Sequence, residues 1–310
     1  MRNLWKDLAI NGDGEYVADC DKGCLGSFDE ITDDKRKLQL KVLPEPFIGD
    51  PATASFVALQ LNPGGALSDD YEKGISSDYR AFKPKHEDIL ANLSGERREM
   101  YWAEPTPNLG EGGKELYSAP HTWYFGAEIE TKSGWEYRFA RRSRFQLLLL
   151  ALSSQQARSE LRKLKDPSID NFHKVVLAAE GENFPSSLDR AYGILRKKFA
   201  VLEYFPYHSN KADTGKIENS NLPSQEYTAY LLEQVLAGGA SIFLTRSVTA
   251  WRSLTPKLFE HGERLIIASN KQSPTFTPGN VCRWDSTAGS QGAKDPNLFW
   301  KVVEKLDPQE

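Results

Sequence analysis

The stretch Ala54-Ser55-Phe56-Val57-Ala58-Leu59-Gln60-Leu61-Asn62-Pro63-Gly64-Gly65 decides the fold. Its first eight residues form a nearly continuous apolar run, and the run stops at residues that favour turns. Short apolar runs bounded by turn residues are typical of strands buried on both faces, as in a parallel sheet. We therefore predict a core strand at 54–61 whose carboxyl end opens into the loop that begins at Asn62.

Three further apolar runs predict the rest of the sheet, and helical patterns alternate with them. The predicted strands lie at 199–205, 241–245 and 264–268, and the clearest predicted helices at 188–197, 224–237, 248–258 and 297–306. Alternating strands and helices are typical of α/β proteins with a parallel sheet. We predict a three-layer α/β/α sandwich around a mainly parallel, four-stranded central sheet.

The 310 residues are divided into an extension and one domain. Residues 1–45 are polar and irregular, with one helix-like stretch at 33–43, and are interpreted as an N-terminal extension. Residues 46–307 are predicted to form a single α/β/α domain. Within it, residues 66–136 lack a clean periodicity and are interpreted as a long insertion with short helices, one of them at 85–93.

Composition limits the classes of function. With 39 Lys and Arg against 43 Asp and Glu, the net charge of −4 excludes a bulk polyelectrolyte binder of DNA, so any nucleic-acid contact must come from a local basic stripe. The longest apolar run, 147–152, is far below the roughly 20 residues that span a bilayer. The N-terminus lacks the apolar segment of a secretory signal, and the three cysteines fit a reducing compartment. We expect a cytoplasmic protein that does not contact membranes.

The sequence lacks the common motifs for binding a metal or a nucleotide cofactor. The cysteines and histidines do not have the spacing of a zinc site, and neither a phosphate-binding loop nor a dinucleotide fingerprint occurs. We expect a protein without metal or cofactor.

The candidate site lies at one edge of the predicted sheet. In open parallel sheets, ligands bind beyond the carboxyl ends of the strands. The segments that follow the four predicted strands begin at Asn62, Pro206, Thr245 and Ser269, and all are rich in polar and turn-forming residues. His208, in the second segment, is a candidate general acid or phosphate contact, and a hydrogen-bonded loop histidine is the alternative.

Asn62-Pro63-Gly64, directly after an apolar strand, resembles the first motif of the uracil-DNA glycosylase superfamily. The form is that of the mismatch-specific and single-strand-selective branches, and residues 44–51 resemble the approach to this motif in uncharacterised bacterial members. The order of the later strands, helices and loops is also similar. The resemblance covers residues 46–70 and 195–285, including a second motif at 269–275.

The resemblance implies hydrolysis of an N-glycosidic bond in DNA or a nucleotide, without a metal. Asn62 is the catalytic residue that the resemblance implies; a neutral Asn62 would orient the attacking water rather than deprotonate it. His208 is the second catalytic candidate, from its place at a strand end. The residues expected to contact the substrate are Pro63, Gly64, Gly65, Phe205, Asn270, Ser273 and Pro274.

The chain also departs from the family pattern at three places. Gln60 stands where the Asn-Pro-Gly branches commonly have Gly, and the spacing of Asn270 and Ser273 in the second motif differs. Ala200 stands where many members have an Asn that reads the uracil edge. These departures leave the identity of the substrate base open. They also leave open a second alternative, a protein of the same fold that binds nucleic acid or nucleotide without catalysis. An unrelated α/β enzyme with a small-molecule substrate and a pocket away from Asn62 is a third alternative.

Arginines form the one basic cluster of note, at positions 138, 141, 142 and 144. If the helix expected over 141–164 extends back to Tyr137, Arg138, Arg141 and Arg142 share a helix face that can meet phosphates. Arg246, after the third strand, is a further candidate for nucleic-acid contact. The alternatives are a solvated helix face and, for Arg246, a pairing with a carboxylate.

Overall fold

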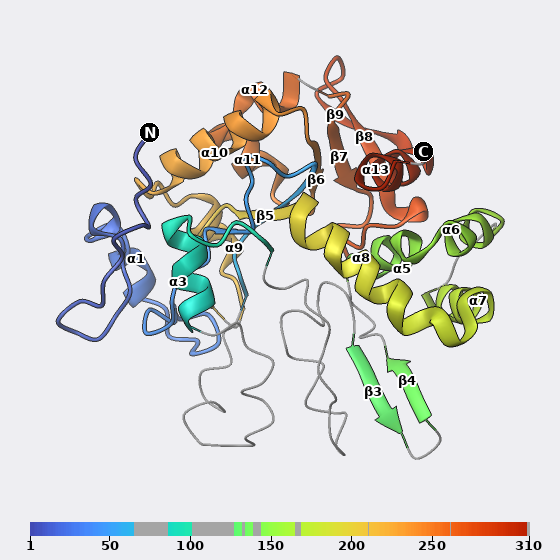
Figure 1. The fold of residues 1–310 in the computed structure, drawn as a ribbon. Helices are drawn as coiled ribbons and strands as arrows, with labels where there is room; N and C mark the ends of the chain where they lie inside the picture. Colours follow the sequence, from blue (N-terminus) through green and yellow to red (C-terminus); the bar gives the residue numbers. More distant parts are fainter. Residues whose placement is uncertain are drawn as a thin grey trace.

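The computed structural model describes residues 1–64, 86–100, 127–131, 134–138, 144–164, 169–209, 211–260 and 262–308. The apolar run at 54–61 forms strand β2 (Phe56–Gln60) inside a seven-stranded mixed sheet (Figure 1). The other predicted strands form β5 (Phe199–Glu203), β6 (Ser241–Leu244) and β7 (Leu265–Ala268). The protein is therefore of the α/β class.

The four predicted strands are neighbours in the order β5-β2-β6-β7, and each pairs in parallel with the next. The sheet is larger than predicted because three antiparallel strands extend it: β1 (Phe47–Ile48) beside β5, and β8 (Val281–Asp285) and β9 (Ser290–Lys294) beyond β7. β1 has only two residues and β9 consists mostly of exposed polar residues, so neither shows an apolar run in the sequence.

Helices cover both faces of the sheet because side chains of each strand alternate between the faces. In β2, Phe56 and Ala58 belong to one apolar core, while Val57 and Leu59 belong to the other. The first core is completed by five helices: α5 (Gln146–Ser153), α6 (Gln155–Arg162), α7 (Ile169–Glu180), α8 (Phe184–Lys198) and α13 (Asn297–Leu306).

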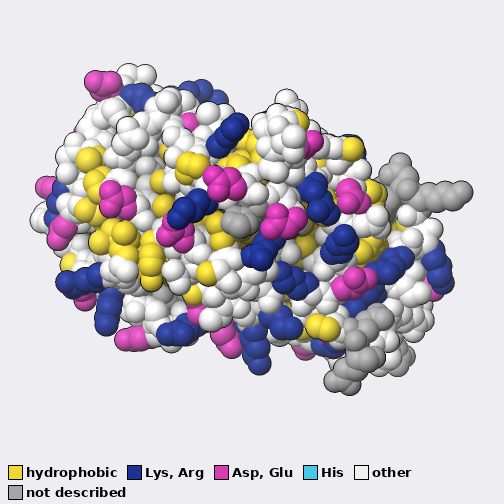
Figure 2. Space-filling model, turned by 90° about the horizontal axis from the view of Figure 1, so that it is seen from above, with side chains coloured by type: hydrophobic (Ala, Val, Ile, Leu, Met, Phe, Trp, Pro, Cys, Tyr) yellow, Lys and Arg dark blue, Asp and Glu magenta, His cyan; other side chains and the backbone are white. Residues whose placement is uncertain are grey.

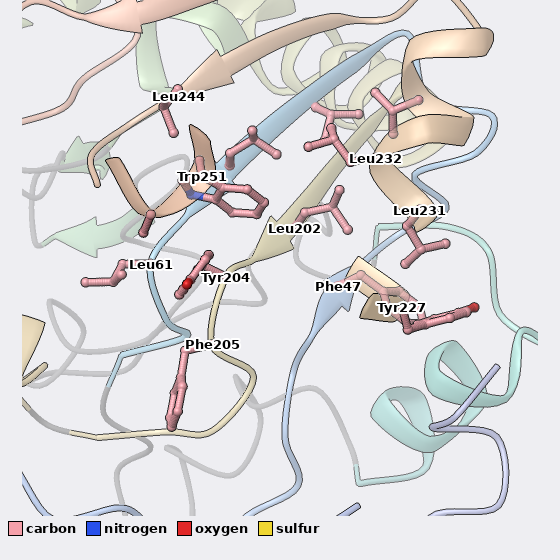
Figure 3. Packing of buried hydrophobic residues seen from close by; sticks show 14 of the residues in the cluster. Phe47, Leu61, Leu202, Tyr204, Phe205, Tyr227, Leu231, Leu232, Leu244 and Trp251 are labelled. Carbon is pink, nitrogen blue, oxygen red and sulfur yellow. The ribbon is translucent and has the colours of Figure 1, made fainter. Parts of the chain in front are cut away.

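Other helices and the N-terminal segment complete the second core. These helices are α1 (Gly26–Asp29), α3 (His86–Ser94), α9 (Thr214–Glu218), α10 (Gln225–Ala237), α11 (Val248–Leu254) and α12 (Pro256–Glu260). Figure 3 shows this core, in which Tyr204 and Trp251 pack edge to face with ring centroids 5.6 Å apart.

The N-terminal segment, residues 1–45, packs on this second core. Trp5 and Phe28 are 1% and 4% exposed, and the ring of Phe28 lies 5.1 Å from that of Phe205. Trp5 also contacts Tyr207 edge to face. The helix-like stretch expected at 33–43 is a series of turns rather than a helix.

Two other helix predictions differ from the structure. Arg138 ends strand β4 (Gly134–Arg138), which pairs with β3 (Ala127–Thr131), and α5 begins only at Gln146. The prediction that a helix extends back to Tyr137 is wrong, and with it the shared helix face of Arg138, Arg141 and Arg142. The expected helix is also interrupted at Ser154, whose hydroxyl accepts a hydrogen bond from the Ala157 amide and caps α6.

Within the described ranges, no helix is both long enough and apolar enough to cross a membrane.

Candidate functional site at the carboxyl edge of the parallel strands

The loops after β2 and β5 meet at one edge of the sheet. Because the two strands are paired in parallel, with Gln60 opposite Glu203, their carboxyl ends lie side by side. The Ser209 amide donates to the Gly64 carbonyl at 3.1 Å, and Asn62 Nδ2 donates to Ser209 Oγ at 3.2 Å. The structure thus brings together two of the four polar segments expected to form the site.

Asn62 lies two residues beyond β2, and its side chain is partly exposed. Its hydrogen bond to Ser209 fixes the plane of the amide, which sets the direction of Oδ1. An oriented amide oxygen accepts a hydrogen bond from water but does not remove a proton from it. The geometry therefore suits a group that positions water.

His208 precedes Ser209 in the chain and is 6% exposed. Its Nδ1 is 3.1 Å from the Gly64 carbonyl oxygen, and because that oxygen only accepts, Nδ1 carries the hydrogen. Nε2 lies 3.5 Å from Oε2 of Glu45, which is also buried. A proton on Nε2 makes this contact an ion pair, so the imidazole is held between the loop backbone and a carboxylate.

Glu203, the last residue of β5, carries a buried carboxyl group at this edge. It is fully buried, and neither carboxyl oxygen has a hydrogen-bond partner among the residues that the structure describes. Burial raises the pKa of Glu203 well above its usual range; Arg144 and Arg246 oppose the rise, and Glu45 adds to it. Gln60 and Glu203 face the first core, because they continue the alternation of Phe56 and Ala58 in β2 and of Phe199 and Val201 in β5.

Backbone hydrogen bonds hold the segment before β1 against the end of β5. The Glu203 amide donates to the Pro46 carbonyl at 2.9 Å, and the Glu45 amide donates to the Pro206 carbonyl at 3.0 Å. Glu45, Gln60, Glu203 and His208 are all at most 6% exposed. Together with Arg144 and Arg246 we call these residues the edge cluster.

Arg246 follows β6 and is partly buried. Burial lowers the pKa of its guanidinium, and the nearby Glu203 carboxyl raises it. This placement fits the interpretation in which Arg246 interacts with a carboxylate. The helix face predicted for the arginines does not form, because Arg138 belongs to strand β4; Arg141 and Arg142 lie outside the described residues. On the face seen in Figure 2, the described Lys and Arg side chains are interspersed with Asp and Glu.

The loop after β7, residues 269–275, is held by hydrogen bonds within the loop and by bonds to Asn280. Asn270 Oδ1 accepts from the amides of Gln272 and Ser273, and Asn280 Nδ2 donates to the carbonyl of Ser273. Asn270 is exposed, Ser273 partly exposed and Pro274 buried. Strand β6 separates β7 from β2, and among the described residues no hydrogen bond joins this loop to Asn62.

The remaining predicted site residues have different positions. Phe205 is fully buried in the second core, where it packs on Phe28 and Tyr207. Pro63 and Gly64 are partly exposed in the first loop, and Gly64 has a φ of 82°, which favours glycine. Gly65 lies outside the described residues. Ala200 lies within β5 and contributes to the second core. The polar residue of β5 is Glu203, at the carboxyl end of the strand.

Sequence reasoning missed Glu45 and Glu203 as parts of the site and treated Gln60 only as a departure from the family pattern. A signal was present: Gln60 and Glu203 each close an otherwise apolar, fully buried strand.

The described part of the chain contains no group of three or more His, Cys, Asp or Glu side chains arranged to hold a metal ion. Comparison of the chain with protein-family models, with curated proteins and with solved structures finds no match in any of the three.

Proposed function

We propose that the protein is a uracil-DNA glycosylase-like enzyme that hydrolyses an N-glycosidic bond in DNA or a nucleotide. The observation that carries the proposal is the placement of Asn62. Its amide stands partly exposed at the carboxyl end of an inner parallel strand and is oriented by Ser209 from the loop after the neighbouring strand. The proposal includes the finer fold class, a three-layer α/β/α sandwich, which the parallel order β5-β2-β6-β7 and the helices on both faces support.

The chemistry requires a water on one face of the anomeric carbon and stabilisation of the departing base. Asn62 Oδ1 would accept a hydrogen bond from that water and align it for attack. His208, fixed by Gly64 and Glu45, would present positive charge near the leaving base when its imidazole is protonated. A base in a duplex must first leave the stack.

Release of free base from uracil-containing single- and double-stranded oligonucleotides tests the proposal. We expect release by the wild-type protein, and a fall of about 100-fold in Asn62→Ala, the cost of losing the position of a reacting group. Ser209→Ala should give a smaller fall, because Asn62 remains but is no longer held. Asn219→Ala, which removes an exposed amide that donates to the Gly215 carbonyl in α9, is the matched control and should leave release unchanged. Equal release by wild type and Asn62→Ala excludes Asn62 from the mechanism.

A second function, binding of nucleic acid or nucleotide without catalysis, is favoured by Phe205. This side chain, expected to contact the substrate, is buried under Phe28. Binding of single-stranded DNA at several salt concentrations separates the two functions: salt-sensitive binding with no base release supports the second.

A further inference from the structure

The carboxyl group of Glu203, in the edge cluster, takes no part in the proposed function. Both of its oxygens are buried, and within the described part of the chain neither has a hydrogen-bond partner. A buried ionised carboxylate without hydrogen bonds is costly, whereas a neutral carboxylic acid in the same place is much less so. The site therefore favours a carboxyl group that carries a proton.

Charged groups from three parts of the chain act on Glu203. Glu45 approaches from the segment before β1, Arg144 from the segment before α5, and Arg246 from the loop after β6. His208, in the loop after β5, faces Glu45. The two arginines favour the ionised carboxylate of Glu203, whereas Glu45 favours the protonated acid. Burial also favours the acid and is the largest effect, so the pKa of Glu203 is raised.

The position of Glu203 relative to Asn62 suits two groups that act on one bond. Asn62 lies two residues beyond Gln60, the register partner of Glu203, so the two residues lie at the same carboxyl edge of neighbouring parallel strands.

We propose that Glu203 is the acid that protonates the leaving base, and that the enzyme therefore acts on bases, such as adenine or cytosine, whose anions leave poorly. This inference rests on the proposed function. The bond between C1′ and the base nitrogen breaks, its electron pair goes to the base, and the Glu203 proton is transferred to the base. Water held by Asn62 adds its oxygen to C1′, and the proton that it releases restores the acid. The net reaction consumes one water.

A comparison of leaving groups tests the inference. Oligonucleotides that carry adenine, cytosine, uracil or 5-fluorouracil at one position are incubated with wild type and with Glu203→Gln, which retains the shape but not the acid. We expect Glu203→Gln to lower release of adenine or cytosine by about 100-fold, within the range for general acid catalysis. Release of 5-fluorouracil, whose anion is stabilised by fluorine, should change by less than about threefold, because its departure needs little help from an acid. Glu233→Gln, on the exposed side of α10, is the matched control.

The pH dependence provides a second readout. The rate on adenine or cytosine should fall above the pKa of Glu203, and Glu45→Gln should move this fall to lower pH, because a neighbouring negative charge is removed. Glu203→Asp keeps an acid and should keep the alkaline fall at a lower rate, which covers the case in which Glu203→Gln does not fold.

The outcomes separate the inference from the proposed function. Release of no base by the wild type overturns both. Release of uracil and 5-fluorouracil alone overturns the inference and leaves the proposed function in place, as does an equal loss on all substrates in Glu203→Gln.

Discussion

The hydroxyl of Tyr207 donates a 2.7 Å hydrogen bond to the carboxylate of Asp21, which joins the N-terminal segment to the loop that carries His208. Asp21 also accepts from the Ser224 amide, and the Ala18 amide donates to the Tyr207 hydroxyl. Asp21 is fully buried and Tyr207 is 1% exposed, so these bonds are shielded from water. The loop that approaches Asn62 is thereby anchored from the far end of the sequence.

Tyr207→Phe should lower the free energy of unfolding by about 1–3 kcal/mol, because Asp21 loses a donor and the Ala18 amide loses its acceptor inside the protein. Urea unfolding at neutral pH measures the change. Tyr230→Phe is the matched control, since Tyr230 is partly exposed on α10, and it should cost less than about 0.5 kcal/mol. Equal effects of the two substitutions would show that the bond to Asp21 adds no stability.

Phe28→Ala should destabilise the whole protein by about 3–5 kcal/mol, because Phe28 is 4% exposed and its ring packs on Phe205. The loss should appear in a single unfolding transition, since Phe28 belongs to the same core as the sheet. Leu4→Ala, at a side chain that is 38% exposed, serves as the control and should have little effect. A separate early transition in Phe28→Ala would mean that the N-terminal segment unfolds independently.

Asp307→Asn should cost about 3 kcal/mol at pH 7, because the carboxylate binds Arg158 at 2.5 Å and Arg190 at 2.7 Å, and Arg158 is only 2% exposed. Burial raises the pKa of Asp307, but the hydrogen bonds from Arg190 and Arg158 outweigh it and hold the pKa below its usual range. A lowered pKa stabilises the fold above the ordinary pKa of the group, and the stabilisation disappears as pH falls through the lowered value.

The difference between wild type and Asp307→Asn should therefore shrink as pH falls below the ordinary pKa of an aspartate, which thermal unfolding at several pH values measures. Glu304→Gln removes a partner of Arg162 whose side chain is 51% exposed, and should cost less than about 1 kcal/mol. A pH-independent difference for Asp307→Asn would contradict the assignment of the stabilisation to its charge.

The parallel strands were predictable because each is buried on both faces, which requires a continuous apolar run such as Phe56-Val57-Ala58-Leu59. β9 was not predictable, because it pairs through its backbone at the edge of the sheet and its side chains carry no apolar pattern. The burial of Phe28 and Trp5 also has no local signal, since both lie in a polar stretch and are covered only by contacts with distant residues.

The sequence predicts the edge of the sheet at which the site lies, but not the charged groups that surround Glu203. The turn residues after β2 and β5 place Asn62 and His208 at the same edge, and the structure confirms that their loops are in contact. The environment of Glu203 depends on Glu45, Arg144 and Arg246, which come from three separate parts of the chain. Only the tertiary structure brings these charges together, so in the sequence Glu203 cannot be distinguished from any other polar residue at the end of a strand.

Glu203→Gln should stabilise the protein, and the gain should increase as pH rises above the ordinary pKa of a glutamate. The folded protein raises the pKa of Glu203, so between the unfolded and folded values the folded state holds a proton that the unfolded state has released. In that interval the titration of this group lowers the free energy of unfolding of the wild type by about 1.4 kcal/mol per pH unit, whereas the glutamine does not titrate.

Asp21→Asn is the informative comparison. Asp21 is equally buried but accepts hydrogen bonds from Tyr207 and Ser224, so this substitution should destabilise the protein. Melting temperatures of both variants and of wild type at pH 5, 6.5 and 8 measure the contrast. A Glu203→Gln variant that is less stable than wild type at pH 8 would show that the carboxylate is ionised and bound there, and the acid assigned to the edge cluster would have to be another group.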